Sequence, residues 1–390
     1  MEQLFITNIT INKVRHLKDI LLPLSENKMK HLILTGKNGS GKTSVVEALA
    51  EYLNAVFTDA VQNGDEEGEI SRIEKSIHYY EQRINQNKKG LDIELNKKCR
   101  NMVELKEKYH YILAYYSADR IFKAEQPVHV EKIQLKNDYG IYEYPRDEFV
   151  KYLLDLKMTE ALARNNNKVE KADKIKAWFE AFEQLLKKIF SDKSIELAFD
   201  EESFEFHIMQ QGKEAFDFNT LSSGYQAVLD IVVDIIMRMQ NQAKRVFDFR
   251  FPGIVLIDEI ETHLHLELQK NIMPLLTTIF PNIQFVVTTH SPFILNSIEN
   301  VVIYDLESNL LVENGLNNVP YDGIVEGYFG ADRLSDTLKE KFEQYRSLVE
   351  KESLSDDEMS KIAELELYLD EIPGSIAIRG SRFVNEFHIL

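Results

Sequence analysis

The sequence is poor in cysteine, with Cys99 alone among 390 residues. A single thiol excludes an internal disulfide and any metal finger built from several thiolates. Long apolar runs are also missing, since none approaches the roughly 20 residues that span a bilayer. The first residues lack the basic and apolar regions of a secretory signal. These absences predict a soluble, cytoplasmic protein with no membrane partner.

Positive charge is in short supply. The chain has 46 Lys and Arg residues against 64 Asp and Glu residues, for a formal net charge of −18. This balance disfavours general wrapping of nucleic acid, although a local basic patch could still bind phosphates. The length predicts two to three domains at about 150 residues each, enough to bury a large core without disulfides.

Short apolar runs alternate with helical periodicity along much of the chain. Continuous apolar runs bounded by glycine or polar residues fit strands buried on both faces. Such strands are expected at 31–34, 111–116, 254–257, 285–287 and 301–304, and helices at 43–57, 225–239 and 265–280. An edge strand is expected at 91–95, and a three-stranded meander at 195–199, 204–209 and 215–218. The pattern predicts an α/β fold with a mixed sheet and an antiparallel lobe.

Two charged regions, 62–110 and 145–190, read as helical insertions into this fold, with helices at 69–86, 147–163 and 168–190. The last of these repeats apolar residues in steps of three and four, at Ala172, Ile175, Phe179, Phe182, Leu186 and Ile189. The seam is shorter than three heptads, so it indicates an amphipathic helix lying on its own domain rather than a coiled coil. Near the C-terminus, Ser355 and Glu358 form a capping box that predicts a helix to about residue 369.

The strongest chemical signal is the segment Gly36-Lys37-Asn38-Gly39-Ser40-Gly41-Lys42-Thr43, between an expected strand and an expected helix. Glycines let successive N–H groups surround phosphate oxygens, and the helix N-terminus favours negative charge. The purely structural alternative is a Gly/Ser turn that caps a helix. The nucleotide-binding residues predicted here are Gly36, Asn38, Gly39, Ser40, Gly41, Lys42, Thr43 and Ser44, with Lys42 on the β- and γ-phosphates and Thr43 on Mg²⁺.

Three further segments carry possible chemistry. Asp258-Glu259 follows an apolar strand, where one carboxylate could reach Mg²⁺ and the other could polarise water. Ser222 and Gly224 open a long helix, either as an ordinary cap or as a phosphate sensor. His290 ends another strand, where it is either a loop residue or a ligand contact.

In their order along the chain, these segments resemble the ATP-binding cassette ATPases of the RecF, SMC and OLD-like branch. The form Asp258-Glu259-Ile260-Glu261-Thr262-His263-Leu264-His265 is similar to OLD-type stand-alone ATPases, whereas transporter cassettes usually have proline after the glutamate. Tyr116-Ser117-Ala118-Asp119-Arg120 looks like the segment that these relatives have in place of the transporter Q-loop. Ser223 departs from the glycine that is common in the signature.

The resemblance implies an ATPase that uses ATP and Mg²⁺. Lys42 and Thr43 would hold phosphate and metal, with Asp258 the metal-side acid and Glu259 the general base. His290 would be the γ-phosphate switch. Ser222 and Gly224 would contact ATP held by the opposite subunit, so two copies would form an ATP-dependent homodimer, with higher homo-oligomers open.

Two purposes remain as hypotheses. The first is an anti-phage ATPase, resembling PtuA-like and retron-associated proteins, that controls a separately encoded nuclease or toxin. Its supporting feature is an absence. OLD nucleases have a Toprim domain after the cassette, which uses a glutamate and a downstream Asp-x-Asp. Val325-Glu326-Gly327 is similar to the first element, but no Asp-x-Asp follows in the remaining residues, about 60, so the effector would be encoded separately. The second is a RecF-like or SMC-like DNA-binding clamp for repair. The clusters that could form its basic groove are Lys97, Lys98 and Arg100; Lys88 and Lys89; and Arg245 and Arg250.

Because the motifs belong to one active site, the sequence predicts one ATPase head at 1–330 followed by a helical appendix at 331–390. The appendix, whose tail includes Arg379 and Arg382, is expected to form a partner-specific surface. A transporter motor is disfavoured by Ile260 and the inserted helices. A metal cluster of Glu261, His263 and His265 is disfavoured against a dimer-facing loop, because zinc needs further ligands that the sequence does not place.

Overall fold

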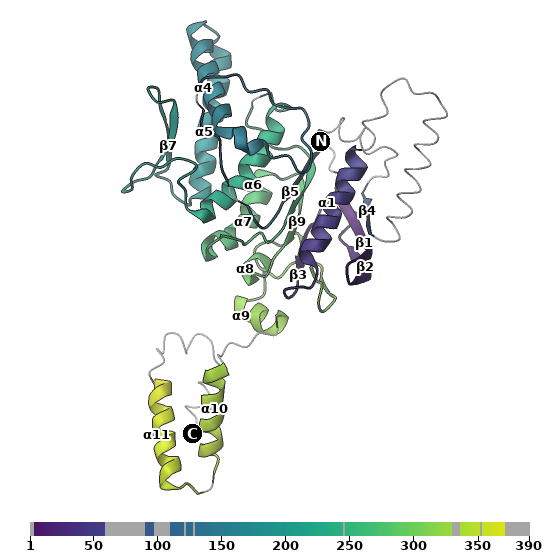
Figure 1. Cartoon of the computed structure of the whole chain (residues 1–390), viewed down its shortest axis with the longest axis vertical. Helices are drawn as coiled ribbons and strands as arrows, with labels where there is room; N and C mark the ends of the chain where they lie inside the picture. The colour runs from purple at the N-terminus through teal and green to yellow at the C-terminus, as the bar shows by residue number, and fades with distance from the viewer. Residues whose placement is uncertain are drawn as a thin grey trace, which may run out of the picture. The chain divides into compact units, whose positions relative to one another are not determined.

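The computed structural model describes residues 4–58, 90–96, 110–120, 122–127, 129–244, 246–329, 336–351 and 353–370 (Figure 1). The chain divides into two compact units, residues 1–317 and 318–390. The helix expected at 69–86 lies outside the described residues, as does most of region 62–110. The division into a head at 1–330 and an appendix at 331–390 stays a prediction.

A six-stranded sheet forms the centre of the first unit, in the order β11-β10-β3-β9-β8-β5. Its strands are β3 (His31–Thr35), β5 (Ile112–Tyr116), β8 (Gly253–Ile257), β9 (Ile283–Thr288), β10 (Val301–Asp305) and β11 (Leu310–Val312). All neighbours are parallel except β11, which pairs antiparallel with β10. Every residue of the five parallel strands is buried, as their continuous apolar runs predict.

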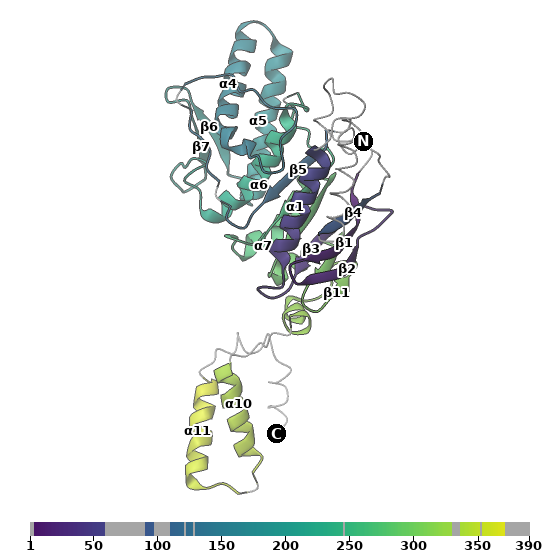
Figure 2. The same cartoon turned by 45° about the vertical axis from the view of Figure 1, so that its right-hand side comes forward.

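A three-stranded antiparallel sheet joins β1 (Ile6–Val14) to β2 (Leu17–Pro23) and to β4 (Leu91–Leu95). Helix α1 (Lys42–Thr58) contacts β1 and β4 of this sheet as well as β8 and β9 of the larger one (Figure 2). Its buried side chains, Val45, Val46, Leu49, Leu53 and Phe57, belong to one apolar cluster with both sheets. The predicted α/β fold with an antiparallel lobe is therefore confirmed.

Further helices pack on the six-stranded sheet and on one another: η2 (Pro145–Glu148), α4 (Phe149–Asn165), α5 (Val169–Ile189), α6 (Ser223–Gln240), α7 (Leu266–Ile279) and α8 (Pro292–Leu295). Helices α4 and α5 lie side by side in both views (Figures 1 and 2). The predicted seam of α5 is right except at one position, because Trp178 is buried instead of Phe179. The helix does lie on its own unit, because Trp178 donates from Nε1 to Oε1 of Gln240 on α6 at 2.9 Å.

The predicted meander is wrong in its third strand. Strands β6 (Glu196–Asp200) and β7 (Glu205–Met209) form an antiparallel hairpin. The segment expected as the third strand contributes one isolated bridge, between Ile208 and Phe216. A buried Phe218 follows directly and packs edge-on against Phe149 of α4, so the chain turns to the helical layer instead of extending the sheet.

The second unit contains α9 (Tyr321–Gly323), the π-helix η3 (Ile324–Tyr328), α10 (Asp336–Val349) and α11 (Asp356–Asp370). The capping box at the start of α11 is confirmed. The Ser355 N–H donates to Glu358 Oε2 at 2.9 Å, and the Glu358 N–H donates to Ser355 Oγ at 3.3 Å. Across the described residues, no helix combines the length and the apolar character that crossing a membrane requires.

Candidate nucleotide-binding site

The sheet order brings three of the predicted motifs to one edge. Strand β9 lies between β3 and β8, and all three run parallel. Their carboxyl ends lead into the glycine-rich loop after β3, into His290 after β9 and into Asp258 after β8. Ligands of α/β sheets bind at such an edge. Segments more than 200 residues apart in sequence therefore meet at one site.

The loop between β3 and α1 has the backbone of a phosphate cradle. Gly36, Gly39 and Gly41 have φ of 133°, 85° and 98°, a region that residues with a Cβ rarely adopt. A Cβ at Gly36 would lie 2.8 Å from Ser40 Oγ. That hydroxyl oxygen is buried and has no hydrogen-bond partner among the described residues. The loop thus combines close backbone packing with an unsatisfied polar atom that a ligand could satisfy.

Lys42 is buried at the first position of α1, and its Nζ donates to the carbonyls of Gly36 at 2.9 Å and Lys37 at 3.1 Å. Burial lowers the pKa of this ammonium group, and the carboxylates of Asp258, Glu259, Glu261 and Asp305 oppose the shift. The loop is also held from outside, because exposed Lys37 pairs with Glu307 at 2.8 Å. Thr43 is exposed beside Lys42, and Ser44 is buried behind it.

Thr288 connects the two acidic residues at the end of β8. Its Oγ1 donates to Asp258 Oδ1 at 2.6 Å and accepts from the Glu259 N–H at 2.7 Å. Glu259 has a left-handed backbone with φ of 43°, which is strained for a residue with a Cβ. Its Oε2 accepts from Thr262 Oγ1 at 3.2 Å. Asp258 is buried and Glu259 is half-buried, so the second carboxylate is the more accessible one.

His290 lies beside the same acidic turn. The backbone N–H of His290 donates to Glu261 Oε1 at 2.5 Å. Burial and the charge of Lys42 lower the pKa of the imidazole, while the carboxylates of Glu261, Glu259 and Asp258 oppose the shift. An imidazole with a lowered pKa is neutral at pH 7, so it has one nitrogen to donate and one to accept.

Arg120 and Thr288 belong to the site, although the motifs predict no role for either residue. Arg120 follows β5 and is almost completely buried. Its guanidinium donates to the backbone carbonyls of Asp258, Glu259 and Ile260, at 2.6, 2.9 and 3.3 Å. Two sequence signals pointed to the segment of Arg120, its position just after a buried strand and its likeness to the segment that replaces the Q-loop, but neither predicted the contacts of the guanidinium.

The predicted signature opens α6. Ser222 is the N-cap residue but makes no capping hydrogen bond with its side chain, and it is exposed together with Ser223. Gly224 is buried where a Cβ would lie 3.1 Å from the carbonyl oxygen of His263 and 3.2 Å from Leu268. The signature turn therefore packs on the loop that follows Asp258 and Glu259, with its serines facing solvent.

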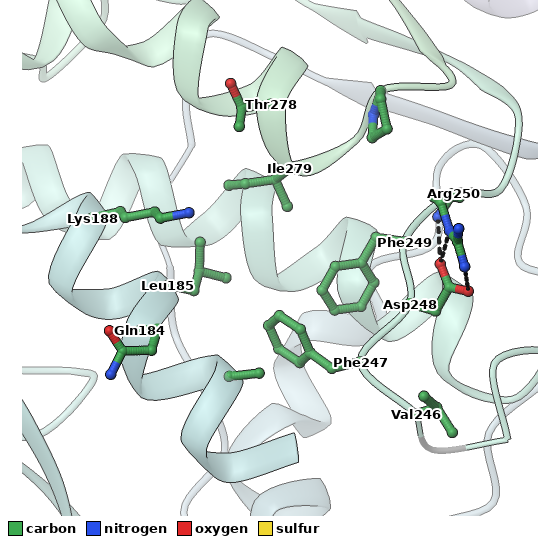
Figure 3. Close-up of a pocket in the computed structure, with 12 residues that line it drawn as sticks. Gln184, Leu185, Lys188, Val246, Phe247, Asp248, Phe249, Arg250, Thr278 and Ile279 are labelled. Carbon is green, nitrogen blue, oxygen red and sulfur yellow. Dashed lines mark hydrogen bonds and ion pairs between the residues drawn. The ribbon is translucent and has the colours of Figure 1, made fainter. Parts of the chain in front are cut away.

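The described residues also bear on two other sequence features, the disfavoured metal cluster and the candidate basic clusters. Within the described ranges, no group of three His, Cys, Asp or Glu residues could hold a metal ion. A groove of about 600 Å³ between α5, the 246–250 segment and the end of α7 contains Arg250 (Figure 3). Arg250 pairs with Asp248 at 2.7 Å. Arg245, Lys88, Lys89, Lys97, Lys98, Arg100, Arg379 and Arg382 lie outside the described residues.

The residues at the sheet edge fit a triphosphate with a divalent cation. A buried ammonium group, a glycine-rich loop and a Ser40 hydroxyl that has no partner in the described part of the chain suit phosphate oxygens. Asp258 and Thr43 supply the oxygen donors that Mg²⁺ prefers.

The comparisons with known proteins agree with these motifs. A protein-family model described as "AAA domain, putative AbiEii toxin, Type IV TA system" matches residues 135–296, fewer than half of the chain. The "Septu protein PtuA" of Bacillus mycoides (strain KBAB4) is 25% identical over 403 residues, which cover 94% of this chain and 50% of that protein. The "Retron Ec83 probable ATPase" of Escherichia coli is 32% identical over 147 residues, 36% of this chain and 27% of that protein. The chain spans half or less of the length of these curated relatives.

One solved structure similar to the chain is an SMC head bound to the C-terminal winged-helix domain of ScpA. It has a TM-score of 0.41 and 13% identity, and it covers 80% of this chain and 98% of that one. The matches to PtuA and to the retron ATPase confirm the resemblance drawn from the motifs: the chain is similar to the ABC/SMC-like ATPases of anti-phage systems.

Proposed function

We propose that the chain binds and hydrolyses ATP as one head of an ATP-gated homodimer, and that its nucleotide state controls a separately encoded nuclease or toxin in anti-phage defence. The observation that carries this proposal is the meeting of the Lys42, Glu259 and His290 segments at one sheet edge. The exposed Ser222 supports a site that a second copy completes. The similarity to PtuA and to a retron ATPase supports the defence role.

Each residue has a role that its surroundings suit. Lys42 neutralises the β- and γ-phosphates, while Asp258 and Thr43 would hold Mg²⁺, which supplies further charge neutralisation when bound. Glu259 accepts the proton of the attacking water, because it is the more accessible carboxylate and its backbone is fixed by Thr288. Neutral His290 contacts the γ-phosphate. Ser222 and Gly224 contact the γ-phosphate of the partner's ATP, so nucleotide binding stabilises the dimer and hydrolysis releases it.

The test of the split site compares two variants with Mg-ATP by light scattering. Glu259→Gln should accumulate a head dimer because ATP stays uncleaved, whereas Lys42→Ala should stay monomeric because it loses the phosphate contact. The same mass distribution for both variants would contradict the model.

A mixing experiment tests the trans contact directly. Ser222→Arg and Lys42→Ala should each lack ATPase activity alone, whereas their mixture should recover a measurable part of it. Each site of the mixed dimer is formed by the Lys42 loop of one chain and Ser222 of the other. One site therefore contains both substitutions, and the other contains neither. Full ATPase activity of Ser222→Arg alone, or no recovery on mixing, would contradict the trans contact. An effector that binds only the Glu259→Gln dimer, identified among proteins encoded beside this gene, would support the defence role.

The DNA clamp receives no support from the described residues. Of its candidate basic residues the structure describes Arg250, and Asp248 neutralises it. We therefore keep DNA retention as an outcome to be measured and not as a second proposed function.

A further inference from the structure

One arginine holds the turn that presents the proposed base. The guanidinium of Arg120 donates to the carbonyls of three successive residues, Asp258, Glu259 and Ile260. Nη1 also donates to the Ser117 carbonyl at 3.0 Å, which fixes the guanidinium to its own loop. Charge-assisted hydrogen bonds of this kind are about twice as strong as neutral ones. A single side chain thus fixes the backbone on both sides of Glu259.

The turn needs such a clamp because its backbone is strained. Glu259 has φ of 43°, and a residue in this conformation persists when its surroundings over-determine it. Carbonyls that leave a strand and turn inward have no sheet partner, and each would be costly to bury unpaired. Arg120 donates to all three carbonyls, and the Thr262 N–H also donates to that of Glu259 at 2.9 Å. Thr288 anchors the Glu259 N–H from the other side.

The segment that carries Arg120 is itself fixed to the signature helix. Tyr116, the last residue of β5, accepts from the Asp258 N–H at 2.8 Å through its backbone. Its hydroxyl donates to Asp234 Oδ2 on α6 at 2.7 Å. A fixed guanidinium on a fixed strand end is what a positioning role requires.

From this geometry we propose that Arg120 is a positioning residue for ATP hydrolysis, which holds the 258–260 turn so that the Glu259 carboxylate meets the attacking water. The inference rests on the proposed function and names the side chain that places its base. Arg120 touches neither ATP nor water in this role; it acts through the backbone of Glu259.

The experiment measures kcat, ATP KM and ATP-driven dimerisation for Arg120→Met and Arg120→Lys. Loss of an outer supporting contact typically costs 10- to 100-fold in activity. We expect kcat to fall on the order of 10- to 100-fold for Met and less for Lys, with KM and dimerisation retained. Gln240→Met is the control for general destabilisation, because Gln240 is also buried and accepts from Trp178 and Tyr152, away from the turn. It should lower thermal stability while leaving kcat within about twofold, since it leaves the turn in place.

A double variant separates positioning from a general structural effect. In the Glu259→Gln background the base is already absent, so Arg120→Met should lower the residual rate no further. Additive losses, or an Arg120→Met enzyme with wild-type kcat, would overturn the inference. If Arg120→Met does not fold, the same comparison made with Arg120→Lys decides. If the wild-type chain neither dimerises with ATP nor hydrolyses it, the proposed function fails first, and the two failures are distinguishable.

Discussion

Asp230 is a fully buried carboxylate on α6, in a cluster of charges behind the nucleotide site. Arg146 Nε lies 2.6 Å from its Oδ1. Burial nevertheless raises the pKa of Asp230 to about 7; Arg146 and Arg120 lower it, whereas Asp234 and Asp147 raise it further. Between the unfolded pKa of 3.8 and the folded value, the native state holds a proton that the unfolded chain has released. This residue therefore makes stability fall as pH rises from about 4 to about 7.

Asp230→Asn should remove this dependence. We expect the stability of the variant relative to the wild type to rise from pH 4 to pH 8, because the folded wild type is protonated at pH 4 and ionises near pH 7. Loss of the Arg146 contact at 2.6 Å lowers the stability of the variant by an amount that adds to this change. The difference should be on the order of a few kcal/mol at most, measured by denaturant unfolding across this pH range. Asp248→Asn is the control with the opposite sign, since a hydrogen bond from Arg250 lowers the pKa of Asp248. Parallel pH profiles for wild type and Asp230→Asn would contradict the expectation.

A second prediction at the scale of one residue concerns Gly224. A Cβ there meets the His263 carbonyl at 3.1 Å, so the loop after Glu259 must shift slightly. We expect Gly224→Ala to weaken ATP-driven dimerisation measurably and to leave nucleotide binding to the monomer unchanged. Equilibrium binding of a fluorescent ATP analogue and light scattering measure the two effects separately. If the monomer of this variant no longer bound the nucleotide, the assignment of Gly224 to the contact with the partner's ATP would be contradicted.

At the scale of elements, Gln240 joins three helices. Its Oε1 accepts from Trp178 of α5 at 2.9 Å and from the Tyr152 hydroxyl of α4 at 2.8 Å. Gln240→Met keeps the volume but removes the acceptor, so it should lower the free energy of unfolding by about 2 kcal/mol. Gln242→Met, at a partly exposed position on the following turn, should change it by less than about 0.5 kcal/mol. Urea unfolding of both variants checks the difference.

The sequence was sufficient where a signal is local. The strand, glycine loop and helix at 31–57 are contiguous, and so are the apolar run and the carboxylates at Asp258 and Glu259. It was insufficient where a long-range contact decides. Arg120 bonds to residues about 140 positions away, and the burial of Trp178 depends on Gln240. The third strand of the meander was lost because Phe218 packs into the helical layer.

At the scale of the whole molecule, the net charge of −18 weighs against a DNA clamp. We expect Glu259→Gln with Mg-ATP to retain no duplex DNA at physiological salt, because the chain is strongly acidic and Asp248 pairs with Arg250, the candidate basic residue that the structure describes. Electrophoretic mobility measured over a salt series checks this. Retention that weakens steeply with salt would instead reveal a basic groove on the closed dimer.

The carboxylates around Lys42 have one more consequence. Asp258, Glu259, Glu261 and Asp305 all act electrostatically on a single ammonium group, so negative charge is in excess where the triphosphate must enter. An uncomplexed nucleotide, with its full anionic charge, meets repulsion there, whereas the magnesium complex meets much less. We therefore expect these carboxylates to favour the magnesium complex over the free nucleotide. A chelator should therefore weaken nucleotide affinity itself, before any step of hydrolysis is reached.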